Sequence, residues 1–285
     1  MKRALAPWLN LVRFGHSVFA LPFALCGAWL AADGPPAPSV CLLIILCAVS
    51  ARTAAMGFNR LVDRRLDGRN PRTAGRELPA GVLSPLSVGL LVLLSAVIFS
   101  AAAAALNPLA GYLAVPVLVV LLGYSLVKRF HWLAHGALGL ALALAPLGAW
   151  VAVRGSVNGE AWPVIALALA VWTWVAGFDL IYACQDADFD RRAGLHSVPA
   201  RFGVAAALRI SSALHVLTVV ALGATALLAG LGGPFLGALA LAAVLLVWEH
   251  RLVRPDDLSR VDAAFFTING WVSVALFLGL ALDMA

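Results

Sequence analysis

Two pairs of aspartates with the same spacing stand out in an otherwise apolar chain. Asp63 and Asp67 close the segment NRLVDRRLD, and Asp186 and Asp190 close the segment QDADFD. Residues four apart share one face of a helix, so each pair would present two carboxylates side by side. Ionisable groups at the edge of a bilayer are costly to place and commonly mark a pathway, a proton relay or a binding site. These carboxylates are therefore the first place to look for chemistry.

Each pair belongs to a longer polar stripe. Asn59 stands four residues before Asp63, and Asp179 and Tyr182 precede Asp186 at helical spacing. Carboxylates at the C-terminus of a helix face the negative end of its dipole, and neighbouring carboxylates repel each other. Both stripes therefore require nearby cations.

Two kinds of partner could meet that requirement. The arginines beside both stripes could form a salt-bridged cytoplasmic loop with no further role. Alternatively, two carboxylate sets on one face suit a polyanion held through magnesium, which takes one or two carboxylates and completes its octahedron with water and phosphate oxygens. Arginines would bind the remaining phosphate oxygens. At the mouth of an apolar bundle, this arrangement predicts a diphosphate head on a lipid-soluble tail.

The composition is that of a membrane protein. Of the 285 residues, 62% are hydrophobic and 12% are charged, and the mean hydropathy is +0.95. Soluble domains carry about 25% charged residues, so we predict an all-α, polytopic protein whose apolar runs satisfy their own backbone in lipid. The length fits one membrane domain over residues 1–285. The net charge of +6 could indicate a nucleic-acid partner, but the basic residues lie in short loops, where they set topology instead.

Nine apolar segments predict nine transmembrane helices in one bundle. They lie near residues 14–32, 38–58, 87–106, 108–125, 132–152, 162–183, 203–229, 233–249 and 263–283. Turn-forming residues such as Ser84-Pro85 separate most of them. Between the third and fourth segments, Asn107-Pro108 is almost the only break.

The basic residues predict the orientation of the bundle. With the N-terminus in the cytoplasm, nineteen of the twenty lysines and arginines fall on the cytoplasmic side, and only Arg154 falls outside. This asymmetry follows the positive-inside rule. It predicts a multi-pass protein of the cell inner (plasma) membrane, with both aspartate pairs on the cytoplasmic face.

Two long motifs of the chain resemble those of a known family. The segments NRLVDRRLDGRNPRTAGRELPAG and FDLIYACQDADFDRRAGLHSVPARFG, together with GYSLVKRFHW at 123–132, look like the signature loops of the UbiA superfamily of intramembrane aromatic prenyltransferases. The similarity runs over essentially the whole chain. It implies nine helices and a cytoplasm-facing magnesium–diphosphate site between two aspartate-rich motifs. Within the superfamily, the motifs are most similar to the 4-hydroxybenzoate polyprenyltransferase-like branch, which includes menaquinone-pathway members.

The resemblance implies a role for each matching residue of the two motifs. The metal ligands would be Asn59, Asp63, Asp67, Asp186 and Asp190, and the four aspartates would also be catalytic. Many members of the superfamily have Asn-Asp at the start of the first motif. Here Asn59 is followed by Arg60, which removes one carboxylate from the motif.

The remaining candidates would bind the two substrates. Three basic residues are candidates for diphosphate binding: Arg64, Lys128 and Arg129. Four residues are candidates for the acceptor pocket: Asp179 and Tyr182, which match the YDxxYA stretch of relatives, and Arg13 and His16, which lie near the inner mouth of the first segment.

The resemblance also implies a reaction. A polyprenyl group would pass from a prenyl diphosphate to a small aromatic acceptor, 4-hydroxybenzoate or a related precursor of ubiquinone or menaquinone. Mg²⁺ and the basic residues would neutralise the leaving diphosphate, and the allylic cation would alkylate the ring. The apolar bundle would keep water from the cation. Aromatic faces at Trp150, Trp172, Trp174 or Phe178 could stabilise it, although membrane aromatics more commonly pack or anchor.

Two alternatives remain open. A haem- or chlorophyll-type prenyltransferase would share the diphosphate chemistry and differ in its acceptor pocket. An ion-coupled transporter would use acidic residues for coupling, but transporters place such groups near the bilayer midplane, whereas these lie at one face. Outside the motifs, we expect Asn269 to hydrogen-bond between helices and His131 and His135 to be interfacial.

Overall fold

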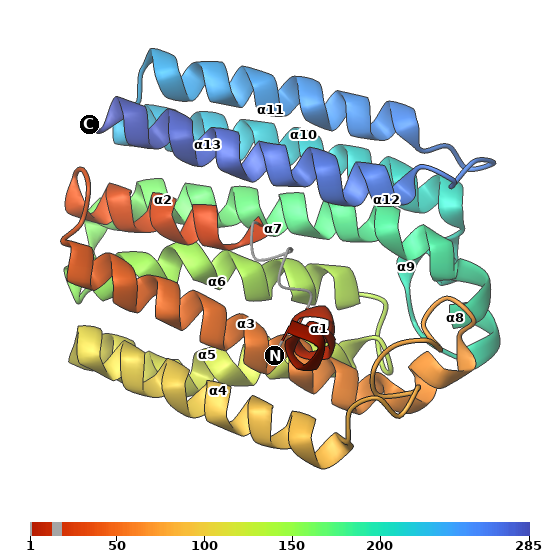
Figure 1. Cartoon of the computed structure of the whole chain (residues 1–285). Helices are drawn as coiled ribbons and strands as arrows, with labels where there is room; N and C mark the ends of the chain where they lie inside the picture. The colour runs from red at the N-terminus through yellow and green to blue at the C-terminus, as the bar shows by residue number, and fades with distance from the viewer. Residues whose placement is uncertain (1, 13–18) are drawn as a thin grey trace.

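The fold is a bundle of long helices. The computed structural model describes residues 2–12 and 19–285. Its elements, shown in Figure 1, are in chain order α1 (Lys2–Leu11), α2 (Leu21–Ala32), α3 (Pro38–Arg69), α4 (Pro85–Leu106), α5 (Pro108–Val127), α6 (Ala134–Arg154), the 3₁₀ helix η2 (Gly159–Ala161), α7 (Trp162–Ala183), the 3₁₀ helix η3 (Cys184–Asp186), α8 (Ala187–Ala193), α9 (Val198–Phe202), α10 (Val204–Ala229), α11 (Gly233–Leu252), α12 (Val261–Ala263), the π-helix η4 (Ala264–Ile268) and α13 (Asn269–Asp283).

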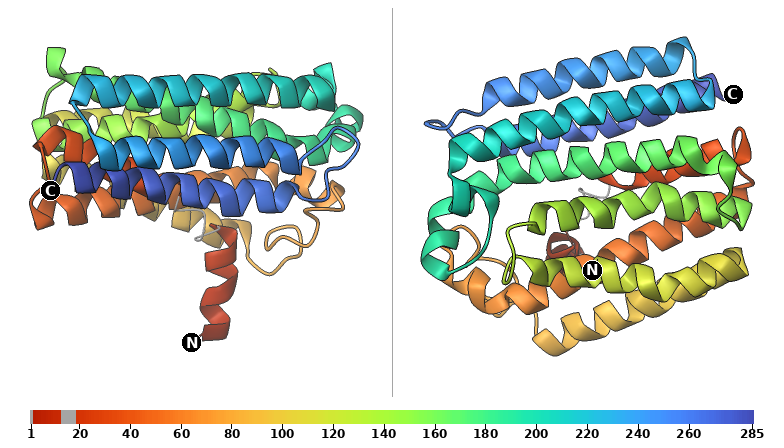
Figure 2. Two further views of the ribbon diagram at one scale, coloured as in Figure 1. Left: turned by 90° about the horizontal axis from the view of Figure 1, so that it is seen from above. Right: turned by 180° about the vertical axis from the view of Figure 1, so that it is seen from behind.

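The long helices lie side by side along one common direction (Figures 1 and 2). α7 packs against both α6 and α10, α3 packs on α4 and α5, α11 packs on α13, and α2 packs on α6. α1 projects away from the bundle (Figure 2). The loop of residues 70–84, α8 and α9 gather at one end of the bundle, whereas the C-terminus lies at the other end (Figure 1).

Eight helices of the described residues are long and apolar enough to cross a membrane. They begin and end within a few residues of the eight segments predicted between 38 and 283, except that α3 continues to Arg69. Over the segment predicted at 14–32, the described residues form α2, an apolar helix of 12 residues. The prediction of an all-helical membrane bundle is confirmed. The count of nine spans and the cytoplasmic N-terminus stay predictions.

The break at Asn107-Pro108 separates two helices, as the sequence predicts. Asn107 caps α5, because its Oδ1 accepts a hydrogen bond from the backbone N–H of Ala110 over 2.8 Å. Its Nδ2 donates to the carbonyl of Val151 on α6 over 2.8 Å. The side chain of Asn107 therefore stabilises the turn between α4 and α5 and bonds this turn to α6.

α7 forms the centre of the core. Its five consecutive residues from Trp174 to Phe178 are all buried, which requires neighbours on every side of the helix. Gly177 permits one close contact, because a Cβ at that position would lie 2.4 Å from the ring of His215 on α10. α7 carries Tyr182, and η3 directly after it carries Asp186, to the end of the bundle at which α3 also ends (Figure 1).

Candidate active site

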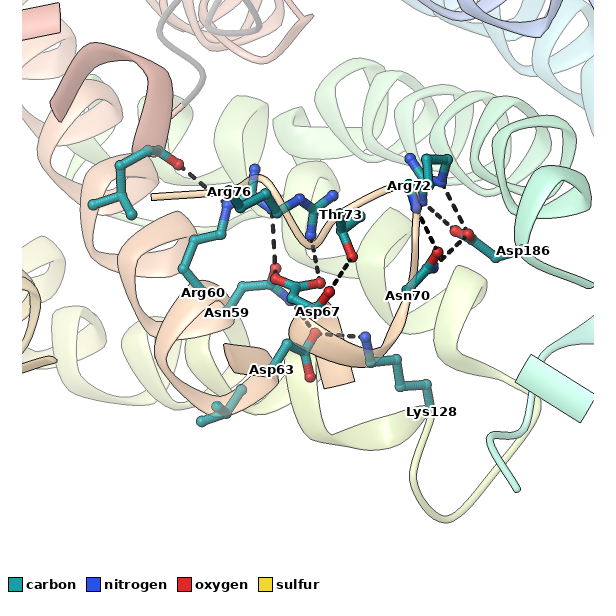
Figure 3. Close-up of polar contacts among 12 residues, drawn as sticks. Asn59, Arg60, Asp63, Asp67, Asn70, Arg72, Thr73, Arg76, Lys128 and Asp186 are labelled. Carbon is teal, nitrogen blue, oxygen red and sulfur yellow. Dashed lines mark hydrogen bonds and ion pairs between the residues drawn. The ribbon is translucent and has the colours of Figure 1, made fainter. Parts of the chain in front are cut away.

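The end of α3 carries the first aspartate stripe. α3 has 32 residues, which is about 48 Å at a rise of 1.5 Å per residue, whereas the hydrocarbon core of a bilayer is about 30 Å thick. Its last turns therefore extend beyond the apolar segment and carry Asn59, Asp63 and Asp67 (Figure 3). Asn59 Nδ2 donates to Asp63 Oδ2 over 3.4 Å, as the spacing of four residues predicts.

Asp63 is enclosed by cations. Its exposed fraction is 2%, and Lys128 Nζ donates to its Oδ2 over 2.5 Å. Arg129 Nη2 donates to its Oδ1 over 3.1 Å and to the carbonyl of Val62 over 2.6 Å. Lys128 and Arg129 follow the end of α5, so the structure brings this predicted basic pair onto the first aspartate. Charge-assisted hydrogen bonds of this kind offset the cost of burying a carboxylate.

Asp67 lies one turn further along α3, and the loop after the helix folds back over it (Figure 3). Arg76 Nη1 donates to Asp67 Oδ1 over 2.7 Å, and Thr73 Oγ1 donates to the Asp67 carbonyl over 3.0 Å. Arg60 is also buried, with Nη1 3.9 Å from Asp67 Oδ2 and Nε donating to the carbonyl of Leu11 over 3.4 Å. The basic residue in the first motif therefore offsets the charge of Asp67 and ties α1 to α3.

Asp186 joins the two motifs. Arg72, from the loop after α3, binds both carboxylate oxygens, with Nε 2.9 Å from Oδ1 and Nη2 against Oδ2 (Figure 3). Asn70 Nδ2 also donates to Oδ1 over 2.9 Å. The remaining Nη1 of Arg72 donates to the hydroxyl of Tyr182 over 2.9 Å. This bidentate geometry is the one in which a guanidinium recognises a carboxylate or a phosphate.

Arg72 keeps its charge at this position. Burial lowers the pKa of its guanidinium, but the hydrogen bonds with Asp186 and Tyr182 outweigh burial and hold the pKa above its usual value. A permanent positive charge therefore stands between the first and second motifs.

Asp190 and Arg64 lie further out. Asp190, on α8, is half-buried and close enough to Asp186 and Lys128 to interact with both charges. Arg64 is exposed on α3, and no hydrogen bond or ion pair joins its side chain to another residue that the structure describes. Of the predicted diphosphate ligands, Lys128 and Arg129 thus form ion pairs with Asp63, whereas Arg64 forms none with the residues that the structure describes.

The carboxylates form an open donor set. Within residues 2–12 and 19–285, no three His, Cys, Asp or Glu side chains cluster closely enough to hold a metal ion. Such a set still fits magnesium, which takes few carboxylates and completes its shell with water and phosphate oxygens. Asp67 Oδ2 is buried and receives no hydrogen bond within the same residues, so this oxygen has spare capacity for a cation.

The acceptor-pocket candidates separate into two groups. Asp179 lies one turn before Tyr182 on α7, and its Oδ2 is 2.7 Å from Nδ1 of His135 on α6. His135 is buried and paired, so the expectation of an interfacial role for it is wrong. Arg13 and His16 lie outside the described residues.

Three residues of this site were not singled out from the sequence: Asn70, Arg72 and Arg76. His135 was named, but its contact with Asp179 was not predicted. The density of arginines in RNPRTAGR was a signal that cations stand near the first motif. The path of the loop decides which arginine meets which carboxylate. For His135, the signal would have required knowing that α6 and α7 pack together.

The chain is similar to known proteins in both sequence and fold. The profile of the UbiA prenyltransferase family matches residues 20–271. The 4-hydroxybenzoate octaprenyltransferase of Nitrosomonas europaea is 32% identical, over 98% of this chain and 95% of its own length. The apo structure of a UbiA homolog from Aeropyrum pernix K1 has a TM-score of 0.87 at 36% identity, over 95% of this chain and 98% of that chain. A UbiA homolog from Archaeoglobus fulgidus, bound to DMAPP and Mg²⁺, has a TM-score of 0.72 at 20% identity, over 97% of this chain and 98% of that chain. From its sequence profile, its relatives and its fold, this chain belongs to the UbiA prenyltransferase family.

Proposed function

We propose that this protein transfers a polyprenyl group from a prenyl diphosphate to 4-hydroxybenzoate or a related aromatic quinone precursor. The observation that carries the proposal is that carboxylates of both motifs are held by cations at one end of an apolar bundle, Asp63 by Lys128 and Asp186 by Arg72. The relative in Nitrosomonas europaea is named a 4-hydroxybenzoate octaprenyltransferase, which supports both the acceptor and the prenyl donor.

The ion pairs of this site can exchange partners. We propose that Asp63, Asp67 and Asp186 would exchange their cations for magnesium, while Lys128 and Arg72 would exchange their carboxylates for phosphate oxygens. Buried charges would stay neutralised throughout, which avoids the desolvation cost of an unpaired charge. We also propose Asn59 and Asp190 as metal ligands. Arg64 and Arg129 are the further proposed ligands of the diphosphate.

The basic residues then act on the leaving group. Bound magnesium supplies Lewis acidity to the diphosphate. Arg72 and Lys128 donate hydrogen bonds to the oxygens on which negative charge accumulates while the allylic C–O bond breaks. The electron pair of that bond leaves with the diphosphate, the acceptor ring forms a C–C bond to the allylic carbon, and the ring releases a proton.

We place the acceptor beside Asp179 and Tyr182, one to two turns deeper than Asp186. His135 orients Asp179, whose carboxylate can accept a hydrogen bond from a phenolic hydroxyl. Arg13 and His16 stay candidates for the same pocket.

We place this site on the cytoplasmic face of the inner membrane, because the basic loops follow the positive-inside rule and the relative in Nitrosomonas europaea is a bacterial protein. The match to residues 20–271 supports one prenyltransferase domain over the whole chain.

The direct test is to incubate membranes that contain the protein with magnesium, a labelled prenyl diphosphate and candidate acceptors. Mass spectrometry of the lipid extract identifies the product. Prenylated 4-hydroxybenzoate would support the proposal, and a prenylated haem or chlorophyll precursor would move the enzyme to another acceptor class. Ion uptake into vesicles without any prenylated product would support a transporter instead.

A further inference from the structure

A second polar cluster lies inside the bundle and takes no part in the chemistry described above. Glu249 on α11 and Asn269 at the start of α13 both have an exposed fraction of 0%. Asn269 Nδ2 donates to Glu249 Oε1 over 2.9 Å, and Asn269 Oδ1 accepts a hydrogen bond from Nε1 of Trp174 over 2.7 Å. One amide therefore links α7, α11 and α13. The expectation that Asn269 hydrogen-bonds between helices is confirmed.

Glu249 is anchored by this amide. Its Oε2 is buried and receives no hydrogen bond from the residues that the structure describes, and His215 Nδ1 lies 3.8 Å from it. His215 is engaged elsewhere, with Nε2 3.3 Å from the Trp174 carbonyl and Nδ1 2.9 Å from His250 Nε2. Since an acidic side chain inside a membrane bundle is costly, its presence calls for a function.

Asn269 also supports an irregular turn. The residues just before it form η4, a π-helix, which is a rare element found frequently at functional sites. Asn269 Nδ2 lies 3.2 Å from the carbonyl oxygens of both Ala264 and Phe265. The amide therefore satisfies backbone carbonyls where the helical register shifts.

The side chains that this amide holds belong to one cluster of aromatic rings. This cluster, named here the aromatic wall, consists of Phe19, Phe23, Trp174, Phe178, Tyr182, Phe265 and Phe266. Ring centroids are 4.9 Å apart for Trp174 and Phe178, and 5.1 Å apart for Phe178 and Phe265. The ring centroids of Phe265 and Tyr182 are 4.4 Å apart, and the hydroxyl of Tyr182 accepts a hydrogen bond from Arg72.

The aromatic wall therefore starts at the proposed diphosphate site. Trp174 precedes Tyr182 by about two turns of α7, so the wall reaches about 12 Å deeper into the bundle. A prenyl chain whose head lies beside Arg72 would have its allylic carbon next to the nearest rings of the wall, those of Tyr182 and Phe265. Aromatic faces attract cations within about 6 Å of the ring centroid, and the deeper rings of Phe178 and Trp174 hold these near rings in place.

We propose that Asn269, oriented by Glu249, is a positioning residue that holds the aromatic wall around the allylic cation and so directs the cation to the acceptor ring and away from water. The inference rests on the proposed function. Because the indole N–H is bonded to Asn269 Oδ1, the ring of Trp174 is restricted to one orientation. Because the same amide holds the carbonyls of η4, Phe265 is fixed with it.

The cation has two fates, and their ratio measures this role. After the C–O bond breaks and its electron pair leaves with the diphosphate, attack by the acceptor ring forms a C–C bond and releases the ring proton. Attack by water forms a C–O bond, releases a proton from that water and gives a prenyl alcohol. If the rings of the aromatic wall lost their fixed positions, water would reach the cation. Prenyl alcohol would then make up a larger fraction of the two products, and this fraction is called the alcohol share below.

The test uses the full-length protein in liposomes, with magnesium, a prenyl diphosphate and the acceptor, and quantifies both products. For Asn269→Leu, we expect the ring product to fall about tenfold and the alcohol share to rise about fivefold, as loss of an oriented cation–π contact would give. KM for the prenyl diphosphate should change less than about twofold, because Asp63 and Asp186 are untouched. Glu249→Leu should behave likewise, whereas Glu249→Gln keeps an acceptor oxygen for Asn269 and should stay within about twofold of the parent.

The matched control is Thr218→Val. It breaks the buried hydrogen bond of 2.8 Å between Thr173 and Thr218, which links α7 to α10 outside the aromatic wall. This variant should keep the parental share of alcohol. If Asn269→Leu accumulates as well as the control and also keeps that share, the inference is overturned. If Asn269→Leu does not accumulate, Trp174→Phe removes the same hydrogen bond from the donor side, because it keeps an aromatic ring and removes the N–H. An unchanged alcohol share in Trp174→Phe also overturns the inference.

Failure of the proposed function gives a different result. A parent protein that prenylates no acceptor would refute the proposed function. The hydrogen bond between Trp174 and Asn269 could still be tested by fluorescence. The emission spectrum of Trp174 is obtained by subtracting the spectrum of the Trp174→Phe variant from that of the same protein with Trp174 intact. Asn269→Leu should shift this difference spectrum, and Thr218→Val should leave it unchanged. An unshifted difference spectrum in both variants would refute the hydrogen bond between Trp174 and Asn269 itself.

Discussion

The two ends of the bundle both carry ion pairs, but of different kinds. At one end, Asp63 has an exposed fraction of 2% and contacts Lys128 and Arg129. At the other end, Arg154 pairs with Asp33 and Glu160, whose side chains are 78% and 65% exposed. Exposed pairs contribute about 0–1 kcal/mol to stability, whereas enclosed charges interact strongly and tolerate no missing partner. Enclosure, more than the presence of opposite charges, distinguishes the candidate site.

The largest expected effect is loss of a carboxylate at the enclosed end. Asp63→Asn or Asp186→Asn should lower kcat/KM for prenyl transfer by about 10³-fold, or about 4 kcal/mol, because a proposed metal ligand is lost. The measurement is product formation in membranes, normalised to protein amount. Asp188→Asn is the control, because Asp188 lies only two residues after Asp186, on the short helix α8, but its side chain is 82% exposed. Equal activity of all three variants would remove the distinction between enclosed and exposed acids.

A smaller effect is expected where the charge stays and the geometry changes. Arg72→Lys keeps a cation but cannot bind Asp186 through two nitrogens and Tyr182 through a third. KM for the prenyl diphosphate should rise about tenfold, because lysine does not replace a bidentate guanidinium. Arg69→Lys, at an exposed position on the last residue of α3, should leave KM unchanged. An unaltered KM in Arg72→Lys would show that only net charge matters at this end.

A more selective effect is expected one layer deeper. His135→Gln removes the imidazole that contacts Asp179, so it should raise KM for the aromatic acceptor by about threefold to tenfold and leave KM for the prenyl diphosphate unchanged. The exposed His131 provides the matched control, as His131→Gln should change neither constant. Parallel increases in both constants would place His135 with the diphosphate site.

The smallest effect is expected at the exposed end. Arg154→Gln breaks the pairs with Asp33 and Glu160, and it should change stability by at most about 1 kcal/mol and leave activity intact. Thermal unfolding in detergent and the prenyl transfer assay measure the two quantities. A large loss of activity would contradict the view that this end has only a topological role.

The helices were predictable because their signals are local. Apolar runs and the turn at Asn107-Pro108 set the spans, and spacing of four residues set the stripe of Asn59 and Asp63. The extension of α3 to Arg69 follows from the same spacing, since a continuous helix is what places that stripe on one face.

The partners of the stripes were not predictable, because they come from other elements. Arg72 reaches Asp186 only through the fold of the loop after α3, and His135 reaches Asp179 only because α6 and α7 are neighbours. The amide of Asn269 could be expected to bond between helices, but neither Glu249 nor Trp174 could be named as its partner from spacing.

The length of α3 has a consequence for how the substrate arrives. From Pro38 to Asn59 the helix rises about 32 Å, which is close to the thickness of the hydrocarbon core. With Pro38 at the opposite membrane surface, we expect Asp63 and Asp67 at the depth of lipid headgroups. A prenyl diphosphate in the bilayer already holds its head at that depth. It can reach the site by diffusing sideways within the leaflet, without lifting its chain into water. The encounter is then two-dimensional, and the rate should follow the mole fraction of prenyl diphosphate in the membrane instead of its concentration in the bulk.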